Sequence, residues 1–180
     1  LDFSKIEAGK IEFDKTNFNL VELIERLHKT FKVKTEEKEI EFNIITDDTL
    51  PEFLRGDQVR LNQILNNLLS NAVKFTEKGS ITLSVKVINR DMDTITLLFA
   101  VKDTGIGIAI DKVDSVFNSF QQESSSTTRK YGGTGLGLTI SKQLVELQGG
   151  KMSLESEKNK GSKFSFHITY DIPARTMVEK

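Results

Sequence analysis

Apolar residues recur along this chain at two spacings, one typical of helices and one typical of strands. Three stretches have the helical spacing, in which apolar residues lie three and four positions apart: Leu20 to about Val33, Leu61 to Phe75, and Ile140 to Leu147. Asn19 is placed to cap the first helix, with Glu22 as its capping-box partner, and Asp57 to cap the second. Gly149 and Gly150 end the third.

The strand spacing, with every second residue apolar, occurs in the segments between these helices. It predicts strands over Lys10–Phe18, Ile40–Ile44, Phe53–Leu54, Ile81–Val87, Ile95–Val101, Met152–Leu154 and Phe164–Tyr170. Several of these strands are joined by short polar turns, as in hairpins. The pattern therefore favours an α+β fold, a mixed and mostly antiparallel sheet covered on one face by three helices, over alternating βαβ units.

The second helix has an unusual polar side opposite its apolar stripe. Its members fall within an arc of roughly 80°, and they are Arg60, Gln63, Asn67, Asn71 and Lys74. Two asparagines one turn apart, followed by a lysine, offer neutral oxygen ligands and a positive charge, which is what a Mg²⁺–phosphate group requires. A merely polar helix face has the same pattern, and Asn62 and Asn66 show that this chain uses asparagine freely.

Four glycines crowd into the six positions from Gly132 to Gly137, directly before the third helix. Glycines that lead into a helix N-terminus direct several backbone N–H groups at one small volume, which suits a polyphosphate. The spacing matches neither the P-loop nor the dinucleotide-binding motif. A flexible surface turn has the same composition, so this segment alone does not decide between the two.

Two further segments are candidates for a binding site. Asp103 ends a predicted strand and is followed by Gly105 and Gly107, an arrangement that aims a carboxylate into a cleft or simply forms an Asp-Gly turn. The stretch from Gln121 to Lys130 is too polar to pack, as expected of a mobile flap over a site or of a disordered loop.

Composition narrows the function further. Lysine and arginine number 25 and aspartate and glutamate 26, so nothing in the net charge indicates a nucleic-acid partner. There is no cysteine, which excludes disulfides and thiolate metal sites, and no apolar run long enough to span a membrane. The chain starts at Leu1 in what has the pattern of a helix, and we interpret it as a fragment. His28 and His167 are expected to be ordinary surface residues.

Four stretches, in this order, resemble the N, G1, F and G2 boxes of the ATP-binding catalytic domain of sensor histidine kinases. That domain belongs to the gyrase, heat-shock chaperone, histidine kinase and mismatch-repair ATPase superfamily. The stretches are Asn67 to Thr76, Asp103 to Ile108, Phe117 to Phe120, and Gly133 to Leu138. The resemblance covers nearly the whole chain and implies a two-layer α/β sandwich of the Bergerat type with a mobile ATP lid.

The resemblance also implies roles for individual residues. Asn71 would coordinate Mg²⁺ on the ATP phosphates, with Asn67 beside it and Lys74 on a phosphate, so these three are the expected catalytic residues. Asp103 would accept a hydrogen bond from the adenine amino group. The remaining expected nucleotide-binding residues are Gly105, Gly107, Phe117, Phe120, Arg129, Gly133, Thr134, Gly135, Leu136, Gly137 and Leu138.

The resemblance further implies what lies outside the chain. Family members phosphorylate a histidine on a dimerisation hairpin, and neither His28 nor His167 has the sequence context of that histidine. We therefore expect residues 1–9 to be the end of the hairpin, residues 10–170 the catalytic domain and residues 171–180 a linker. The expected partners are the hairpin of a homodimer and a response-regulator receiver domain, in the cytoplasm, with any membrane reached only through upstream segments.

Two other functions are compatible with these motifs. Hydrolytic ATPases of the superfamily carry a glutamate one turn before the Mg²⁺ asparagine, where this chain has Asn67. An ATP-sensing module that binds the nucleotide without turnover would retain the same boxes. The absence of a carboxylate on the polar helix side favours the kinase.

Overall fold

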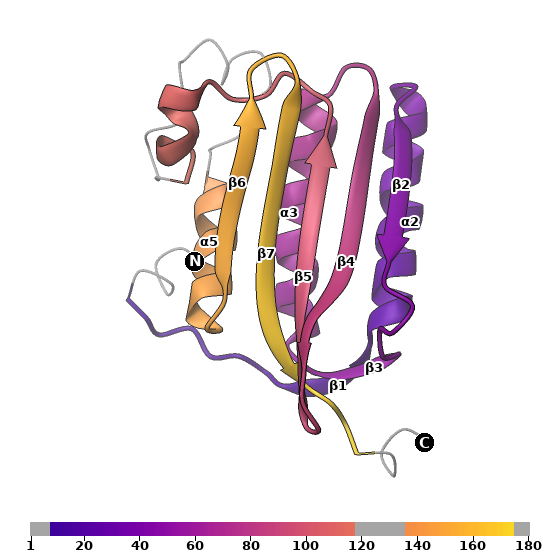
Figure 1. Cartoon of the computed structure of the whole chain (residues 1–180), viewed down its shortest axis with the longest axis vertical. Coiled ribbons are helices and arrows are strands. Elements are labelled where there is room, and N and C mark those ends of the chain that lie inside the picture. The colour runs from indigo at the N-terminus through magenta and orange to yellow at the C-terminus, as the bar shows by residue number, and fades with distance from the viewer. Residues whose placement is uncertain (1–7, 118–135, 175–180) are drawn as a thin grey trace.

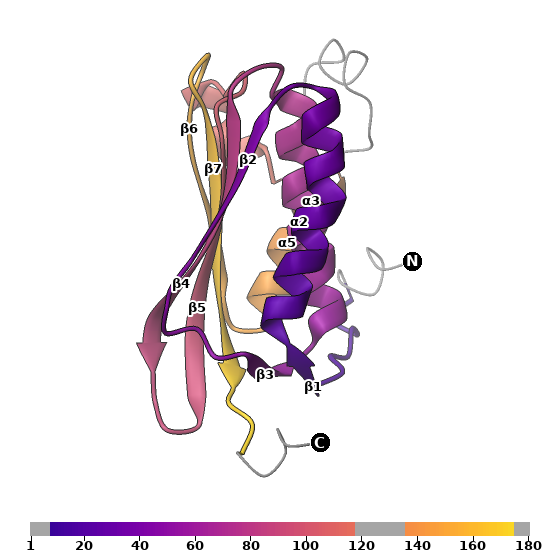
Figure 2. The same ribbon diagram turned by 90° about the vertical axis from the view of Figure 1, so that its right-hand side faces the viewer.

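The computed structural model of the chain describes residues 8–117 and 136–174. These residues form two layers, a twisted seven-stranded sheet and three α-helices that cover one of its faces, while the other face carries no helix (Figures 1 and 2). The elements are β1 (Thr16–Asn19), α2 (Leu20–Glu37), β2 (Glu41–Thr46), β3 (Phe53–Gly56), α3 (Gln58–Phe75), β4 (Ser80–Arg90), β5 (Thr94–Asp103), the 3₁₀ helix η1 (Ile110–Ser115), α5 (Leu136–Leu147), β6 (Lys151–Glu157) and β7 (Gly161–Asp171). The expected α+β sandwich is confirmed.

The sheet is mixed and mostly antiparallel, as the sequence predicted. Its order is β1-β3-β7-β5-β4-β2, and β6 pairs with β7. Only β2 and β4 are parallel among the pairs in the described part of the chain. The long strands β4, β5 and β7 form the centre, whereas β3 joins β7 through the single pair Arg55 and Asp171. The centre of the sheet is therefore a rigid support for the loops at its ends.

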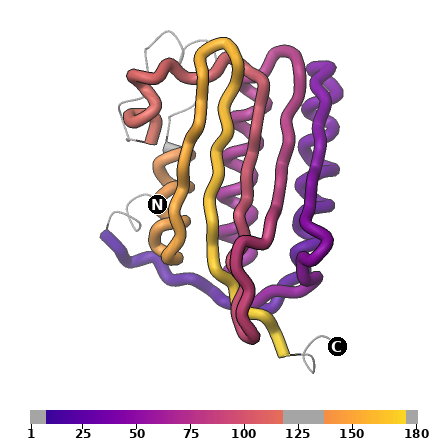
Figure 3. The backbone as a smooth tube through the Cα atoms, in the orientation of Figure 1, coloured from indigo at the N-terminus to yellow at the C-terminus, as the bar shows by residue number. Residues whose placement is uncertain are grey.

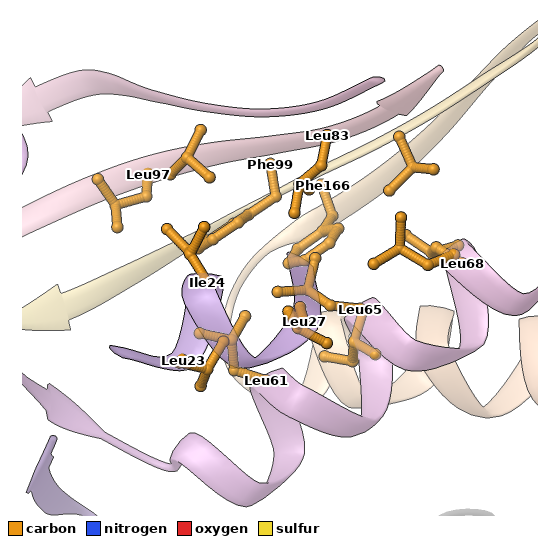
Figure 4. Close-up of a cluster of buried hydrophobic side chains, with 14 of the residues drawn as sticks. Leu23, Ile24, Leu27, Leu61, Leu65, Leu68, Leu83, Leu97, Phe99 and Phe166 are labelled. Carbon is orange, nitrogen blue, oxygen red and sulfur yellow. The ribbon is translucent and has the colours of Figure 1, made fainter. Parts of the chain in front are cut away.

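The core lies between the central strands and the apolar sides of α2 and α3 (Figure 4). Leucines from both helices, among them Leu23 and Leu65, are fully buried against the sheet. On the sheet side, Phe99 and Phe166 are register partners whose rings stack with centroids 4.9 Å apart. Burying such a side chain contributes roughly 1.5–3 kcal/mol, so these apolar stripes supply most of the free energy that orients α3.

Two helix caps follow the sequence prediction, but several boundaries do not. Asn19 and Asp57 accept hydrogen bonds from the backbone N–H groups of Glu22 and Arg60 and begin α2 and α3. α2 continues to Glu37, beyond the expected end near Val33, whereas α3 begins at Gln58, directly after its predicted cap. β7 ends at Asp171, where a linker was expected to begin. No helix in the described ranges is long and apolar enough to cross a membrane.

The strand expected over Lys10–Phe18 is wrong for most of its length. Only Thr16–Asn19 pairs, because its partner β3 is itself four residues long. Ile11 and Phe13, whose alternation suggested the longer strand, are half-buried and pack against the core without strand pairing. The alternation of apolar residues therefore reflects packing against the core and not pairing with a neighbouring strand. The helix expected over residues 1–9 lies mostly outside the described residues.

Candidate functional site

Asp103, the last residue of β5, is the one acidic residue of the expected site, and its side chain is buried. It is 6 % exposed, and its Oδ1 accepts hydrogen bonds from the N–H groups of Gly105 (2.9 Å) and Ser162 (3.3 Å). Burial raises the pKa of this carboxyl above its usual value, and the two hydrogen bonds oppose the rise. Within the described residues, Oδ2 accepts no hydrogen bond, which leaves it available to a ligand donor.

The two glycines after Asp103 allow close contacts within the protein. A Cβ added to Gly105 would lie 2.2 Å from the Phe75 carbonyl oxygen. Gly107 has a φ of +67°, and a Cβ added there would lie 2.0 Å from the Glu157 carbonyl oxygen. Ile106 N–H donates to the same Phe75 oxygen at 3.1 Å. The turn is thus fixed between the end of α3 and the β6–β7 turn, at the end of the sheet where the chain leaves β5 (Figure 3).

The two asparagines and the lysine on the polar side of α3 differ in their contacts. Asn67 donates from Nδ2 to the carbonyl oxygen of Gly137 (3.2 Å) and to Oγ of Ser141 (3.0 Å), so it joins α3 to α5. Asn71 is half-buried and Lys74 is exposed. Neither of these two side chains makes a hydrogen bond or an ion pair with another described residue. The structure therefore gives Asn67 a structural contact and leaves Asn71 and Lys74 unengaged.

The donor set fits one kind of metal site. The described residues contain no group of three or more histidine, aspartate or glutamate side chains that could hold a metal ion. Mg²⁺ usually keeps several waters and binds through one or two protein oxygens together with substrate phosphates. The amide oxygen of Asn71 fits such a shared ion, and it does not fit a metal held by the protein alone.

The start of α5 and the segment before it are described only in part. Phe120, Arg129, Gly133, Thr134 and Gly135 lie outside the described residues, and Leu136 is the first residue of α5. A Cβ on Gly137 would be 3.6 Å from Asn67 Cγ, an ordinary contact, so space does not require this glycine. Leu138 is 9 % exposed and belongs to the core.

Phe117 anchors the chain just before that undescribed stretch. Its ring meets the Phe164 ring edge-on at 5.9 Å, and the Lys142 ammonium lies 5.2 Å from the ring centroid. Its carbonyl oxygen accepts a hydrogen bond of 2.7 Å from Thr139 Oγ1. Residues of β7 and α5 therefore hold the position at which the expected lid begins.

Sequence reasoning missed three polar residues that support this site. Ser162 donates its backbone N–H to Asp103 and continues the alternation of the buried residues Phe164 and Phe166. Extending the strand pattern by one step would have placed Ser162 on the buried side of the last strand, but not beside Asp103. Thr139 and Ser141 are buried on the apolar side of α5. A hydroxyl at a core position of a helix was the available signal, because buried hydroxyls require partners.

A hollow at the other end of β7 is separate from this site. It is lined by Phe13, Lys15, Asp57 and Tyr170, among others. Tyr170 is paired with Ile95 near the start of β5, whereas Asp103 at the end of β5 is paired with Ser162. The length of β5 therefore lies between the hollow and Asp103.

Known proteins resemble this chain in both sequence and fold. A family model described as histidine kinase-, DNA gyrase B-, and HSP90-like ATPase matches residues 56–172. Hybrid signal transduction histidine kinase B of Dictyostelium discoideum is 42 % identical over 98 % of this chain and 9 % of its own length. Autoinducer 2 sensor kinase/phosphatase LuxQ of Vibrio vulnificus is 46 % identical over 93 % of the chain and 20 % of its own length. The chain thus spans a fifth or less of these two relatives.

Solved structures of histidine kinases also resemble this chain in fold. Full-length ShkA in complex with AMPPNP has a TM-score of 0.81 and 31 % identity, with 96 % of this chain and 35 % of that one covered. A nucleotide-free catalytic domain of the histidine kinase ThkA has a TM-score of 0.67 and 29 % identity, with 91 % of this chain and 100 % of that one covered. From its fold and these similarities, the chain belongs to the histidine kinase-, DNA gyrase B- and HSP90-like ATPase family, as a histidine kinase catalytic ATPase domain.

Proposed function

We propose that this chain binds Mg-ATP and transfers its γ-phosphate to a histidine on a dimerisation hairpin outside the sequence, as the catalytic domain of a two-component sensor kinase. The observation that carries the proposal is the junction between the Asp103 turn and α3. Ile106 N–H donates to the last carbonyl of α3. The carboxylate proposed to bind the base, and the side chains of Asn71 and Lys74, which have no polar partner among the described residues, therefore belong to one connected unit.

In this proposal each side chain meets a different part of the nucleotide. Oδ2 of Asp103 accepts from the adenine amino group, Asn71 supplies one oxygen to Mg²⁺, and Lys74 contacts a phosphate. Gly133, Gly135 and Gly137 offer backbone N–H groups to the phosphates. Mg²⁺ supplies neutralisation of the phosphate charge when it is bound. Phosphoryl transfer requires mainly positioning and charge neutralisation, which these residues are suited to provide.

Asn67 favours transfer over hydrolysis. A hydrolytic enzyme needs a general base to activate water, and an amide cannot serve as one. The Nδ2 of Asn67 is in addition engaged with Gly137 and Ser141 on α5. The acceptor nucleophile would then arrive from outside the domain. An ATPase and an ATP-sensing module without turnover remain as the competing functions.

The proposed partners follow from the missing acceptor. His28 packs edge-on against Phe42 with ring centroids 5.6 Å apart, on the side of the sheet that the helices cover. His167 pairs in register with Leu98 and Lys151. Neither occurs in the acceptor motif. The hairpin of a homodimer supplies the histidine, and a receiver domain accepts the phosphoryl group, in keeping with relatives named hybrid kinases. The reaction would take place in the cytoplasm.

The test is transfer of labelled phosphate from Mg-ATP to a separately supplied hairpin of the parent protein, with phosphate release followed in parallel. Asn71→Ala removes the proposed Mg²⁺ ligand. Asn62→Ala is the matched control, because Asn62 is an exposed asparagine on the same helix. Acid-labile label on the hairpin with wild type and Asn62→Ala, and none with Asn71→Ala, supports the kinase. Free phosphate alone indicates the hydrolase, and tight binding without either product indicates the sensing module.

A further inference from the structure

The C-terminal end of α3 is held by two groups from outside the helix. The last four carbonyl groups of an α-helix have no partner within it. The Val73 carbonyl oxygen accepts a hydrogen bond of 2.5 Å from the Lys38 ammonium, and the Phe75 carbonyl oxygen accepts from Ile106 N–H at 3.1 Å. The first contact comes from the end of α2 and the second from the Asp103 turn.

The backbone of Lys38 is itself fixed. Lys38 is the C-cap of α2, and its N–H bonds to the carbonyl oxygens of Thr35 and Glu36. The next residue, Glu39, has a φ of +58°, and Ile40 N–H returns to the Thr35 oxygen at 2.8 Å. This tight turn ends α2 beside the end of α3, since the two helices run side by side (Figure 2). The backbone from which the Lys38 side chain extends is therefore fixed in position.

The Lys38 ammonium makes no ion pair with any described residue, although it is half-buried. Its hydrogen-bonded partner is the carbonyl end of a helix, where the macrodipole places a partial negative charge. A hydrogen bond from a charged donor is stronger than one between neutral groups. The contact therefore restrains the last turn of α3 more firmly than a neutral cap would.

Val73 lies between Asn71 and Lys74, the two residues proposed to meet the Mg²⁺–phosphate group. We propose that Lys38 is a positioning residue for phosphoryl transfer: by holding the Val73 carbonyl it fixes the turn of α3 from which Asn71 and Lys74 reach the phosphates. This inference rests on the proposed nucleotide function and adds a residue that does not touch the nucleotide.

Because the two contacts hold different parts of the site, mutation of Lys38 should affect phosphate binding and base binding differently. Loss of the Lys38 contact frees the turn that carries Asn71 and Lys74. The Ile106 contact to Phe75 and the Gly105 approach to the same oxygen still hold the Asp103 turn. Binding that depends on phosphates should fall, while binding that depends on the base should persist. A residue that only stabilises the fold would affect both alike.

The experiment measures the affinity of the 180-residue chain for Mg-AMPPNP and for adenosine by calorimetry or competition. The variants are Lys38→Met, which removes donor and charge, Lys38→Gln, which keeps a shorter neutral donor, and Lys38→Arg. Lys78→Met is the control, because Lys78 is an exposed lysine three residues after the end of α3 and its loss removes the same charge. Thermal unfolding of each variant verifies that it is folded at the assay temperature.

We expect Lys38→Met to weaken Mg-AMPPNP binding about tenfold more than Lys78→Met does, and to leave adenosine binding within about twofold of wild type. Lys38→Gln should show a smaller loss in the same direction, and this variant decides the question if Lys38→Met is unfolded. Lys38→Arg should recover most of the affinity. Equal weakening of both ligands, or equal loss in Lys78→Met, overturns the inference alone. A wild-type chain that binds no Mg-AMPPNP overturns the proposed function and this inference with it.

Discussion

The amide nitrogen of Asn67 lies 3.0 Å from the hydroxyl oxygen of Ser141 and joins α3 to α5. The same nitrogen also donates to the Gly137 carbonyl in the first turn of α5. Ser141 is fully buried and Asn67 is half-buried, so the contact is a partly buried polar link between the two helices. The start of α5 is therefore positioned by the helix that carries the proposed Mg²⁺ ligand.

Replacing Asn67 should weaken this link. We expect Asn67→Ala to lower the free energy of unfolding by about 1–3 kcal/mol, because the buried Ser141 hydroxyl and the Gly137 carbonyl lose the hydrogen bonds that Asn67 donates. Urea denaturation measures the change. Asn66→Ala is the matched control, since Asn66 donates only to the Asn62 carbonyl of its own helix and its loss should cost less than about 0.5 kcal/mol. Equal losses in the two variants would contradict the role assigned to Asn67.

The close approach at Gly107 gives a second prediction. Gly107 and Gly149 both have positive φ values, +67° and +85°, but only at Gly107 would a Cβ meet backbone, with the Glu157 oxygen 2.0 Å away. We expect Gly149→Ala to cost about 1 kcal/mol for the backbone conformation alone. Gly107→Ala should cost about 3 kcal/mol or more, because the Asp103 turn must also move from β6. Thermal and chemical denaturation of the pair give the difference, and similar costs would show that the turn has room to adjust.

Asp103 predicts a particular dependence of stability on pH. Burial raises its pKa in the folded protein, so the folded state binds this proton more tightly than the unfolded chain does. Ionised Asp103 thus lowers the free energy of unfolding. Wild type should therefore become less stable as the pH rises from about 3.9, the usual pKa of aspartate, through the raised pKa of Asp103 in the folded protein. Asp103→Asn does not titrate. Its stability relative to wild type should therefore increase across that window and then level off, and a flat or falling difference would contradict the burial argument.

The same substitution should separate stability from binding. Asparagine in place of Asp103 can still accept the hydrogen bonds of Gly105 and Ser162 through its Oδ1. Its Nδ2 would then present a donor where the proposal requires an acceptor for the adenine amino group. We expect a folded variant whose affinity for Mg-AMPPNP is reduced at least about tenfold, measured by calorimetry at pH 7. Unchanged affinity would remove Asp103 from the base contact.

Much of the fold could be predicted because buried positions recur at regular spacings in the sequence of a helix or strand. The stripe that includes Leu61, Leu65 and Leu68 is buried as the spacing of apolar residues required, and Asp57 caps α3 as its side chain allowed. The strand expected from Lys10 could not be corrected from sequence. Alternation reports contact with the core, and whether Ile11 and Phe13 also have a strand partner depends on the length of β3, a distant segment.

The site was predictable only where a residue's role is local. Asp103 and the glycines that follow it could be recognised together, because they form one turn. Ser162 lies 59 positions from Asp103 and reaches it through the pairing of β5 with β7, which no short pattern records. The contact of Lys38 with Val73 spans 35 positions and depends on how α2 lies beside α3. Such contacts follow from tertiary packing and required the structure.

Asp57 accepts hydrogen bonds from two separate segments, the first turn of α3 and the segment that precedes β1. Its Oδ1 accepts from Arg60 N–H (3.1 Å) to cap α3, and its Oδ2 accepts from Asp14 N–H (3.0 Å) in the segment that precedes β1. Asp57→Ala should lower the free energy of unfolding by about 2–4 kcal/mol, because a cap and a partly buried hydrogen bond to a charged group are both lost. Asp57→Asn retains one acceptor oxygen and should lose about half as much. In that variant we expect the Asp14 amide to exchange with solvent at least about tenfold faster, measured by NMR, with Asp48→Asn as an exposed control that removes the same charge. Unchanged exchange at Asp14 would mean that packing of Phe13 against the core, and not Asp57, holds this segment to the domain.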